Sequence, residues 1–267
     1  YNMRISRPGI TYLNPYVDRS QPTSLSYGNT DLSAEKTHNI SLVYNSYSQN
    51  FMWNATLKQT FCNDGIDQYS FIEDNIMHRT YGNIVKRQVR SLSVYASALI
   101  AKNTRLIFNG SGSYTDLSSD KLNRSNSGFS GNAMFTLQQT LPSNWSLTAT
   151  AITSSSRISI QGSSAGMNMG MFSVSKTMFD DRLSLSASIM TSLSKGFKLH
   201  FDQYTEGPNF TNSMKSSIPM TRIQASVTWK FGNTKKMYQK QHRSKVNSDY
   251  IEHQSDTENM GNAGNNM

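Results

Sequence analysis

The stretch RIQASVTWKF, residues 222–231, alternates polar and apolar residues without a break. A period of two residues is that of a β-strand, because successive side chains of a strand point to opposite faces. The apolar face of this stretch ends on two aromatic residues, Trp229 and Phe231. The stretch therefore predicts a strand that separates an apolar environment from water.

The same alternation recurs along most of the chain before residue 222. It is clearest in residues 38–44, 51–61, 91–100, 105–114, 129–137, 145–151 and 183–189. In residues 168–176 the facing stays open, because Met169 and Met171 compete with Phe172 and Val174 for the apolar face. With residues 1–7 counted as the end of a strand, the pattern predicts about ten strands.

The composition fits strands that have one apolar face and one uncharged polar face. The 267 residues are 36% hydrophobic and 10% aromatic but only 16% charged. No apolar run approaches the roughly 18 residues that a membrane-spanning helix needs. If these strands contact lipid, they belong to a closed barrel, because open backbone edges cannot face lipid.

Short and long connections alternate between the predicted strands. Short turns lie at residues 49–50, 102–103, 142–144 and 180–182, and long polar connections lie at residues 64–79, 116–126, 154–166 and 195–219. Short periplasmic turns at one rim and longer extracellular loops at the other are typical of outer-membrane barrels. We expect Trp53, Trp145, Trp229 and Phe231, beside short turns or the last strand's end, to form an aromatic girdle at the periplasmic membrane interface.

A soluble β-sandwich is the alternative interpretation of this pattern. In a sandwich the aromatic residues lie on inner faces, without regard to loop length. The polar faces of a soluble sheet also normally carry more Lys and Glu than Ser and Asn. The Ser-rich and Asn-rich polar faces of this chain therefore favour an antiparallel transmembrane β-barrel.

The end of the chain differs in composition from the rest. Residues 233–267 are polar, poor in aromatics and rich in Asn, Gln and Lys, which predicts a disordered periplasmic tail after a barrel segment of residues 1–232. Most of the net charge of +9 lies in the patterned segment. Its one short basic cluster, Lys86, Arg87 and Arg90, has no interleaved aromatic residues, so we do not expect nucleic acid as a partner.

The first long connection and the last strand resemble segments of the TonB-dependent receptors. The connection contains Arg7-Pro8, Leu13-Asn14-Pro15 and Gly28-Asn29-Thr30-Asp31-Leu32-Ser33-Ala34-Glu35, and the last strand ends on Trp229-Lys230-Phe231-Gly232. The resemblance is to the outer-membrane β-barrel family of Bacteroidota-type receptors and covers residues 1–232. The sequence departs from the loop pattern at Thr30 and Ala34, where Pro is usual. The residues that match the loop motif are Arg7, Pro8, Leu13, Asn14, Pro15, Gly28, Asn29, Asp31, Leu32 and Glu35.

This resemblance implies a 22-stranded barrel with a plugged lumen, of which the ten strands would be the C-terminal part. It implies uptake of a large solute across the outer membrane of a Gram-negative bacterium. The implied partners are outer-membrane lipid, an unknown solute or surface-exposed lipoprotein, and, through an N-terminal part missing from these residues, a plug domain and the TonB system.

The sequence shows no set of residues that points clearly to catalysis or to metal binding. The spacings H-x-x-x-H and H-E-x-x-H are absent among the five histidines His38, His78, His200, His242 and His253. The G-x-S-x-G spacing occurs at residues 162–166, but Ser is so abundant in this chain that the match does not indicate a catalytic nucleophile. Asp64, Gly65 and Asp67 lack the remaining ligands of a calcium loop. We therefore expect no enzyme, cofactor or metal site. A small passive or structural barrel and, less so, an enzymatic barrel remain the alternatives.

Overall fold

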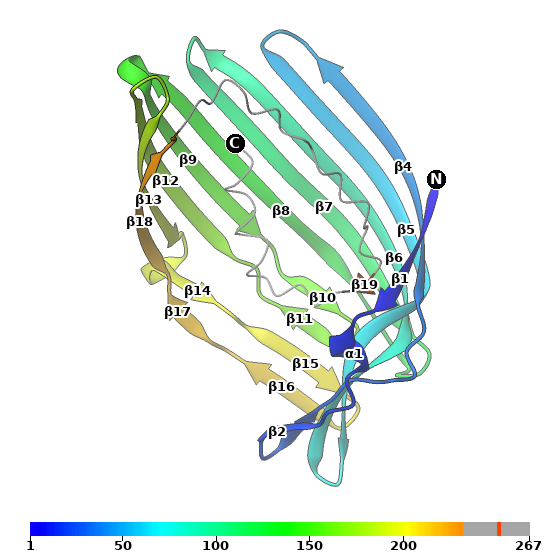
Figure 1. Ribbon diagram of the computed structural model, residues 1–267. Coiled ribbons are helices and arrows are strands. Elements are labelled where there is room, and N and C mark those ends of the chain that lie inside the picture. Colours follow the sequence, from blue (N-terminus) through cyan, green and yellow to red (C-terminus); the bar gives the residue numbers. More distant parts are fainter. Residues whose placement is uncertain (232–249, 252–267) are drawn as a thin grey trace.

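The structure, a computed structural model, describes residues 1–231 and 250–251 of the chain. Its largest part is one antiparallel sheet that curves into a trough (Figure 1). The long strands of this sheet are β1 (Asn2–Pro8), β4 (Glu35–Tyr47), β5 (Phe51–Glu73), β6 (Ile76–Ala101), β7 (Thr104–Ser119), β8 (Arg124–Leu141), β9 (Trp145–Ser154), β12 (Asn168–Met178), β13 (Leu183–Ser192) and β18 (Thr221–Trp229). These ten strands confirm the predicted antiparallel all-β fold.

Each long strand pairs with the next long strand along the chain, in the order β18-β13-β12-β9-β8-β7-β6-β5-β4-β1. Among the described residues, the two outermost strands, β1 and β18, do not pair with each other. A further short strand, β19 (Tyr250–Ile251), pairs in parallel with the end of β1. The predicted boundary after residue 232 and the rest of the predicted tail lie outside the described residues.

One rim of the sheet, which we call the short-turn rim, consists of tight turns. These turns lie at residues 48–50, 102–103 and 179–182 and at the 3-10 helix η1 (Pro142–Asn144). Asn144, Asp180 and Asp181 have positive φ angles of 61°, 51° and 63°. Asn and Asp tolerate this left-handed region better than most residues, which explains why they occupy these turns.

At the opposite rim, the long-connection rim, the prediction of long polar loops is wrong. β5 and β6 continue to a tight turn at Asp74 and Asn75, and β7 and β8 meet across residues 120–123. The remaining connections form a second sheet of β10 (Arg157–Ser159), β11 (Gly162–Ser164), β15 (Gln203–Gly207) and β16 (Phe210–Met214). Strand pairing satisfies the backbone N–H and C=O groups of these segments, even though their side chains are polar.

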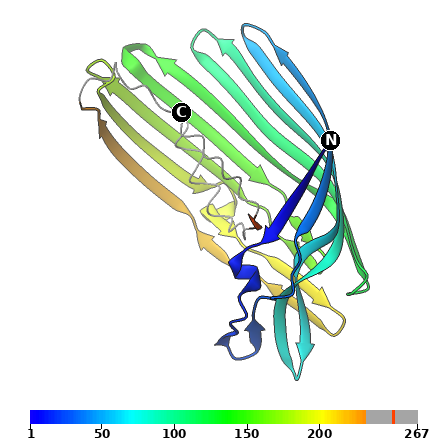
Figure 2. The same cartoon turned by 45° about the vertical axis from the view of Figure 1, so that its right-hand side comes forward.

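Shorter elements complete this rim, at the bottom of Figures 1 and 2. The first connection contains α1 (Ile10–Leu13), β2 (Asp18–Gln21) and β3 (Ser24–Ser26), and β3 pairs in parallel with β6. The connection after β13 also contains η2 (Lys195–Phe197), β14 (Lys198–His200) and β17 (Ser217–Pro219). No helix in residues 1–231 is long and apolar enough to cross a membrane.

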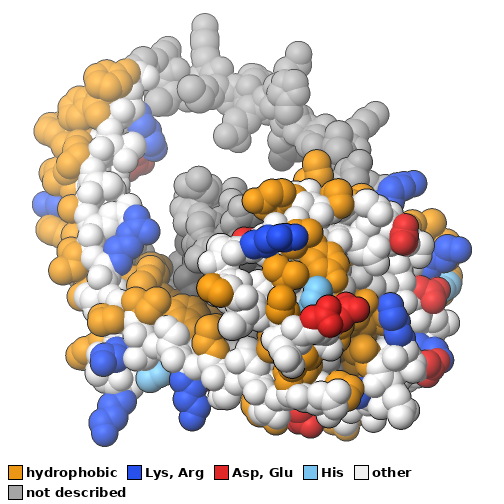
Figure 3. All heavy atoms as spheres, turned by 90° about the horizontal axis from the view of Figure 1, so that it is seen from below, with side chains coloured by type: hydrophobic (Ala, Val, Ile, Leu, Met, Phe, Trp, Pro, Cys, Tyr) orange, Lys and Arg blue, Asp and Glu red, His pale blue; other side chains and the backbone are white. Residues whose placement is uncertain are grey.

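The strand register gives the long sheet one apolar face and one polar face. On the convex outer face, Leu42 lies opposite Leu57, which lies opposite Leu92. Phe172, 49% exposed, shares this outer face, whereas Met169 points to the inner face and is 1% exposed. The register thus settles the facing that the sequence left open. Figure 3 shows hydrophobic side chains gathered along the outside of the wall around a hollow interior.

The buried apolar residues lie at the long-connection rim instead of along the sheet. One cluster consists of Ile84, Val85, Leu117 and Ile160, and a second consists of Tyr12, Ile66 and Tyr81. By contrast, the large apolar residues of the outer face are exposed, as in Leu57, Phe135 and Ile223. An exposed apolar face of this extent marks a surface that contacts membrane or protein.

Candidate functional site

Part of the predicted loop motif folds into a compact structure at the long-connection rim, which we call the rim clamp: Tyr12, Asn14, Gly28, Asn29, Leu32 and Glu35, with Ile66 and Tyr81 of the wall. The N–H of Gly28 donates to the carbonyl oxygen of Asn14 at 2.9 Å, and the N–H of Asn29 donates to that of Tyr12 at 2.6 Å. The side-chain amide of Asn29 donates to the carbonyl oxygen of Tyr81 at 3.0 Å. The first two bonds close the connection on itself, and the third fixes it to β6.

Gly28 is required by the close approach of two backbone segments. A Cβ atom at this position would lie 2.5 Å from the carbonyl oxygen of Tyr12 and 2.6 Å from that of Asn14. Both contacts are with backbone atoms, which cannot rotate away. A side chain at position 28 would therefore separate α1 from the segment that leads into β4.

Glu35 connects the clamp to β5. Its carboxylate, on a residue only 8% exposed, accepts the N–H of Ile66 at 2.5 Å. Arg87 on β6 lies 3.9 Å from the same carboxylate oxygen. Burial raises the pKa of Glu35, and the nearby Arg87 guanidinium opposes that rise. Burial likewise raises the pKa of Tyr12 to about 12.

The remaining motif residues have more varied positions. Leu32 packs against the cluster of Tyr12, Ile66 and Tyr81. The N–H of Asp31 donates to the side chain of Asn29 at 2.9 Å. Three further motif residues frame α1: Pro8 ends β1, Leu13 ends α1 and Pro15 follows it. Arg7 pairs with Tyr250 of β19.

The sequence did not identify a second contact at this rim, which comes from the turn between β10 and β11. Gln161 is buried, and its amide accepts the N–H of Ser70 at 2.7 Å and donates to the carbonyl oxygen of Ser70 at 2.9 Å. The neighbouring Ile160 is buried against Val85 and Leu117. This turn joins the second sheet firmly to the wall. In the sequence, the only sign of this contact is the apolar Ile160 between the short segments that form β10 and β11.

The predicted girdle residues lie along the short-turn rim, on strands that are not adjacent, and of these four described residues only Trp229 and Phe231 contact each other. Trp145 lies opposite Leu141 and Trp229 opposite Leu183, each at the end of its strand, and Trp53 contacts Tyr44 at a ring distance of 5.1 Å. The Lys176 ammonium lies 4.9 Å from the Trp145 ring centre. Phe231 follows Trp229, with ring centres 6.2 Å apart. A girdle at a membrane interface remains their predicted role.

A second aromatic pair marks the other border of the apolar outer face. Tyr114 on β7 lies opposite Phe129 on β8, and both side chains are exposed. A barrel strand needs about 9–11 residues to cross a membrane. Residues 104–114 of β7 match that length, so we call the outer face between the tryptophans and the Tyr114–Phe129 pair the apolar belt.

The inner face of the same strands is polar and mostly uncharged. Its hydroxyl groups form cross-strand pairs, with oxygen distances of 3.2 Å for Thr136–Thr150, 3.0 Å for Ser113–Ser130 and 2.7 Å for Ser186–Ser226. Three cations, Lys58, Arg105 and Arg222, belong to this face by register. Such a surface suits contact with water and polar solutes.

Comparison with known proteins agrees with this two-faced wall. A search of curated proteins gives no match. In the described residues, no group of three or more His, Cys, Asp or Glu side chains is placed to hold a metal ion. A family model described as outer membrane protein beta-barrel family matches residues 1–229, from the first residue to the end of β18. The chain therefore belongs to this family, located in the outer membrane of Gram-negative bacteria.

Proposed function

We propose that this chain forms part of the barrel wall of a receptor for TonB-dependent uptake of a large solute. The observation that carries the proposal is the open trough of ten strands, whose edge strands β1 and β18 do not pair with each other in the described residues. A sheet that crosses lipid cannot leave such edges unpaired. Further strands at these edges would make a wide barrel, and barrels of 22 strands hold a plug in the lumen.

In this proposal each part of the wall has a physical role. The hydroxyl-lined inner face borders the plug and the aqueous path of the solute. The rim clamp and the second sheet, at the extracellular end, hold the entrance in a fixed shape. The solute, or a surface-exposed lipoprotein that delivers it, would first contact this entrance. The proposal requires neither a catalytic residue nor a cofactor.

The alternative is a small passive porin, and two measurements on the native full-length protein distinguish the two functions. The protein, tagged and extracted from outer membranes, is tested for recovery of TonB and for conductance in planar bilayers. The proposal predicts that TonB is recovered and that no steady open-channel conductance appears. Steady conductance without recovery of TonB would overturn it in favour of a porin.

A further inference from the structure

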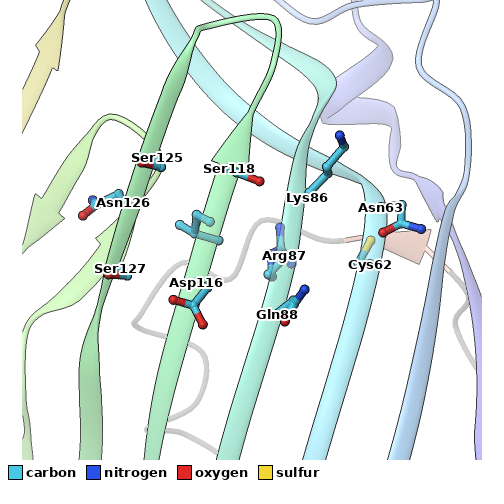
Figure 4. Close-up of a pocket in the computed structure, with 11 residues that line it drawn as sticks. Cys62, Asn63, Lys86, Arg87, Gln88, Asp116, Ser118, Ser125, Asn126 and Ser127 are labelled. Carbon is cyan, nitrogen blue, oxygen red and sulfur yellow. The ribbon is translucent and has the colours of Figure 1, made fainter.

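A polar groove lies on the outer face of the wall, between the apolar belt and the long-connection rim (Figure 4). Its volume is about 590 Å³, and it crosses four neighbouring strands, β5, β6, β7 and β8. The backbone of Cys62, Arg87, Leu117 and Asn126 forms its floor, because their side chains point to the inner face. Its two walls are rows of outward side chains: Lys86, Ser118 and Ser125 in one row, and Gln88, Asp116 and Ser127 in the other.

The strand register places this groove next to the belt. Gln88 lies opposite Asp116, and two residues further along β6 Arg90 lies opposite Tyr114 at the border of the belt. Leu92, 49% exposed, follows on the same face. A molecule that occupies the groove therefore also contacts the apolar surface beside it.

The charged groups around the groove are arranged in two exposed ion pairs. The Lys86 ammonium lies 2.6 Å from the Asp120 carboxylate, and the Arg90 guanidinium lies 3.1 Å from that of Asp116. Exposed pairs of this kind contribute little stability, about 0–1 kcal/mol in most proteins. A phosphate can therefore replace either carboxylate as the partner of the cation, and the carboxylates, serine hydroxyls and Gln88 amide can bind sugar hydroxyls.

On the belt side of the groove, the apolar surface contains two glycines beside aromatic rings. Gly110 and Gly112 face outward on β7, and the Phe108 and Phe129 rings lie over them. A Cβ atom at Gly112 would come within 2.8 Å of the Phe129 ring. Flat rings over glycines leave a shallow face that extended acyl chains can contact along their length.

We propose that this groove binds the phosphorylated sugar headgroup of a glycolipid in the outer leaflet. Lys86 and Arg90 contact the phosphate, the serine and carboxylate groups contact sugar hydroxyls, and the acyl chains lie along the belt. A lipid fits better than a soluble anion, because the groove opens toward the membrane at the height where lipid headgroups lie. The proposal requires that the chain lies in the outer membrane with the long-connection rim on the extracellular side, and it is independent of the transport function.

The test compares two lipid probes and two matched double variants of the protein in detergent micelles. Native mass spectrometry measures the fraction of protein that carries diphosphoryl lipid A or dephosphorylated lipid A. K86Q/R90Q removes both outer cations, whereas K58Q/R105Q removes two cations from the inner face of neighbouring strands. A cation near an anionic lipid surface contributes about fivefold in affinity. We therefore expect K86Q/R90Q to bind diphosphoryl lipid A about 25-fold more weakly, K58Q/R105Q to bind it like the unmodified protein, and the dephosphorylated lipid to show no such difference.

A third variant separates loss of binding from damage to the fold. D120N removes the carboxylate that competes for Lys86 and lies in an exposed turn. It should bind diphosphoryl lipid A a few-fold more tightly, which a destabilised barrel would not do. Equal weakening by both double variants, loss of binding to both lipids alike, or weaker binding by D120N would overturn the proposal.

Discussion

The apolar belt and the long-connection rim are built from the same strands but are stabilised in different ways. In the belt, β6 presents Leu92 and Val94 to the outside, and its apolar side chains cover no protein core. Nearer the rim, the same strand contributes Val85, which is fully buried beside Leu117 and Ile160. The belt therefore depends on lipid as its apolar solvent, whereas the rim has a small protein core of its own. The effect of a substitution on stability should therefore depend on lipid in the belt and on protein packing at the rim.

The largest effect is expected from a charge in the middle of the belt. Val94 faces outward between Ala55 and Gly110, and Ser93 faces inward between Thr56 and Ser111. An arginine on the lipid face of a barrel costs about 2–4 kcal/mol at the bilayer midplane. We expect V94R to lower the free energy of unfolding by this amount and S93R to change it by less than about 0.5 kcal/mol. Guanidinium titration of the protein in lipid vesicles, followed by tryptophan fluorescence, measures both.

Two outcomes of this pair would contradict the comparison. Equal losses for V94R and S93R would show that both faces contact the same medium. A larger loss for S93R would show that lipid contacts the opposite face. In detergent-free solution V94R should not fold better than the unmodified protein, because the rest of the belt still requires lipid.

The sequence predicted the belt better than the rim for a physical reason. A strand between lipid and water must alternate, so residues 222–231 alone identify its facing. Adjacency to short turns likewise predicted the position of Trp53, Trp145 and Trp229 at the short-turn rim. At the rim both faces contact protein or water, so the alternation weakens and residues 64–79 resembled a loop. These residues form a strand because they pair with β6, and the local sequence pattern does not predict this pairing.

The candidate site was predictable to a similar, partial extent. The resemblance singled out Gly28, Asn29 and Glu35, but the roles of Asn29 and Glu35 depend on Tyr81 and Ile66, which are distant in sequence. The bond between Gln161 and Ser70 joins residues 91 positions apart. A buried glutamine has no distinctive local pattern, so only the three-dimensional pairing reveals it.

A smaller, local effect is expected from removal of the Gln161 side chain. Q161A leaves the N–H and the carbonyl of Ser70 buried without their partner, and an unsatisfied buried group costs about 1–3 kcal/mol. Hydrogen exchange at the Ser70 amide should become faster by the factor that corresponds to this free-energy cost. Exchange at the amides of the belt should stay unchanged. Q49A, in an exposed turn of the short-turn rim, is the matched control and should change neither. If Q161A slowed folding of the whole barrel without faster exchange at Ser70, the rim would not be an independently stabilised region.

The smallest effect is a pH dependence that belongs to the rim alone. Burial raises the pKa of Glu35 and of Asp67, against the lowering influence of Arg87 on both. When the pKa of an acid is higher in the folded state than in the unfolded state, its contribution to stability is complete below the unfolded pKa, about 4 for these residues. That contribution is lost as pH rises through the folded pKa, because the buried carboxyl must then become charged. The rim clamp should therefore open more readily as pH increases above about 4.

E35Q tests this pH dependence at one position. Glutamine keeps an oxygen that accepts the N–H of Ile66 but cannot ionise, so the pH dependence of clamp opening should become shallower. The measurement is hydrogen exchange at the Ile66 amide, corrected for the intrinsic effect of pH on exchange. D18N is the control: hydrogen bonds from the backbone and the side chain of Ser20 lower the pKa of the exposed Asp18, so this variant should leave the slope at Ile66 unchanged. An unchanged slope in E35Q would assign the pH dependence to Asp67, whereas a slope shared by the belt would mean that the two regions do not unfold independently.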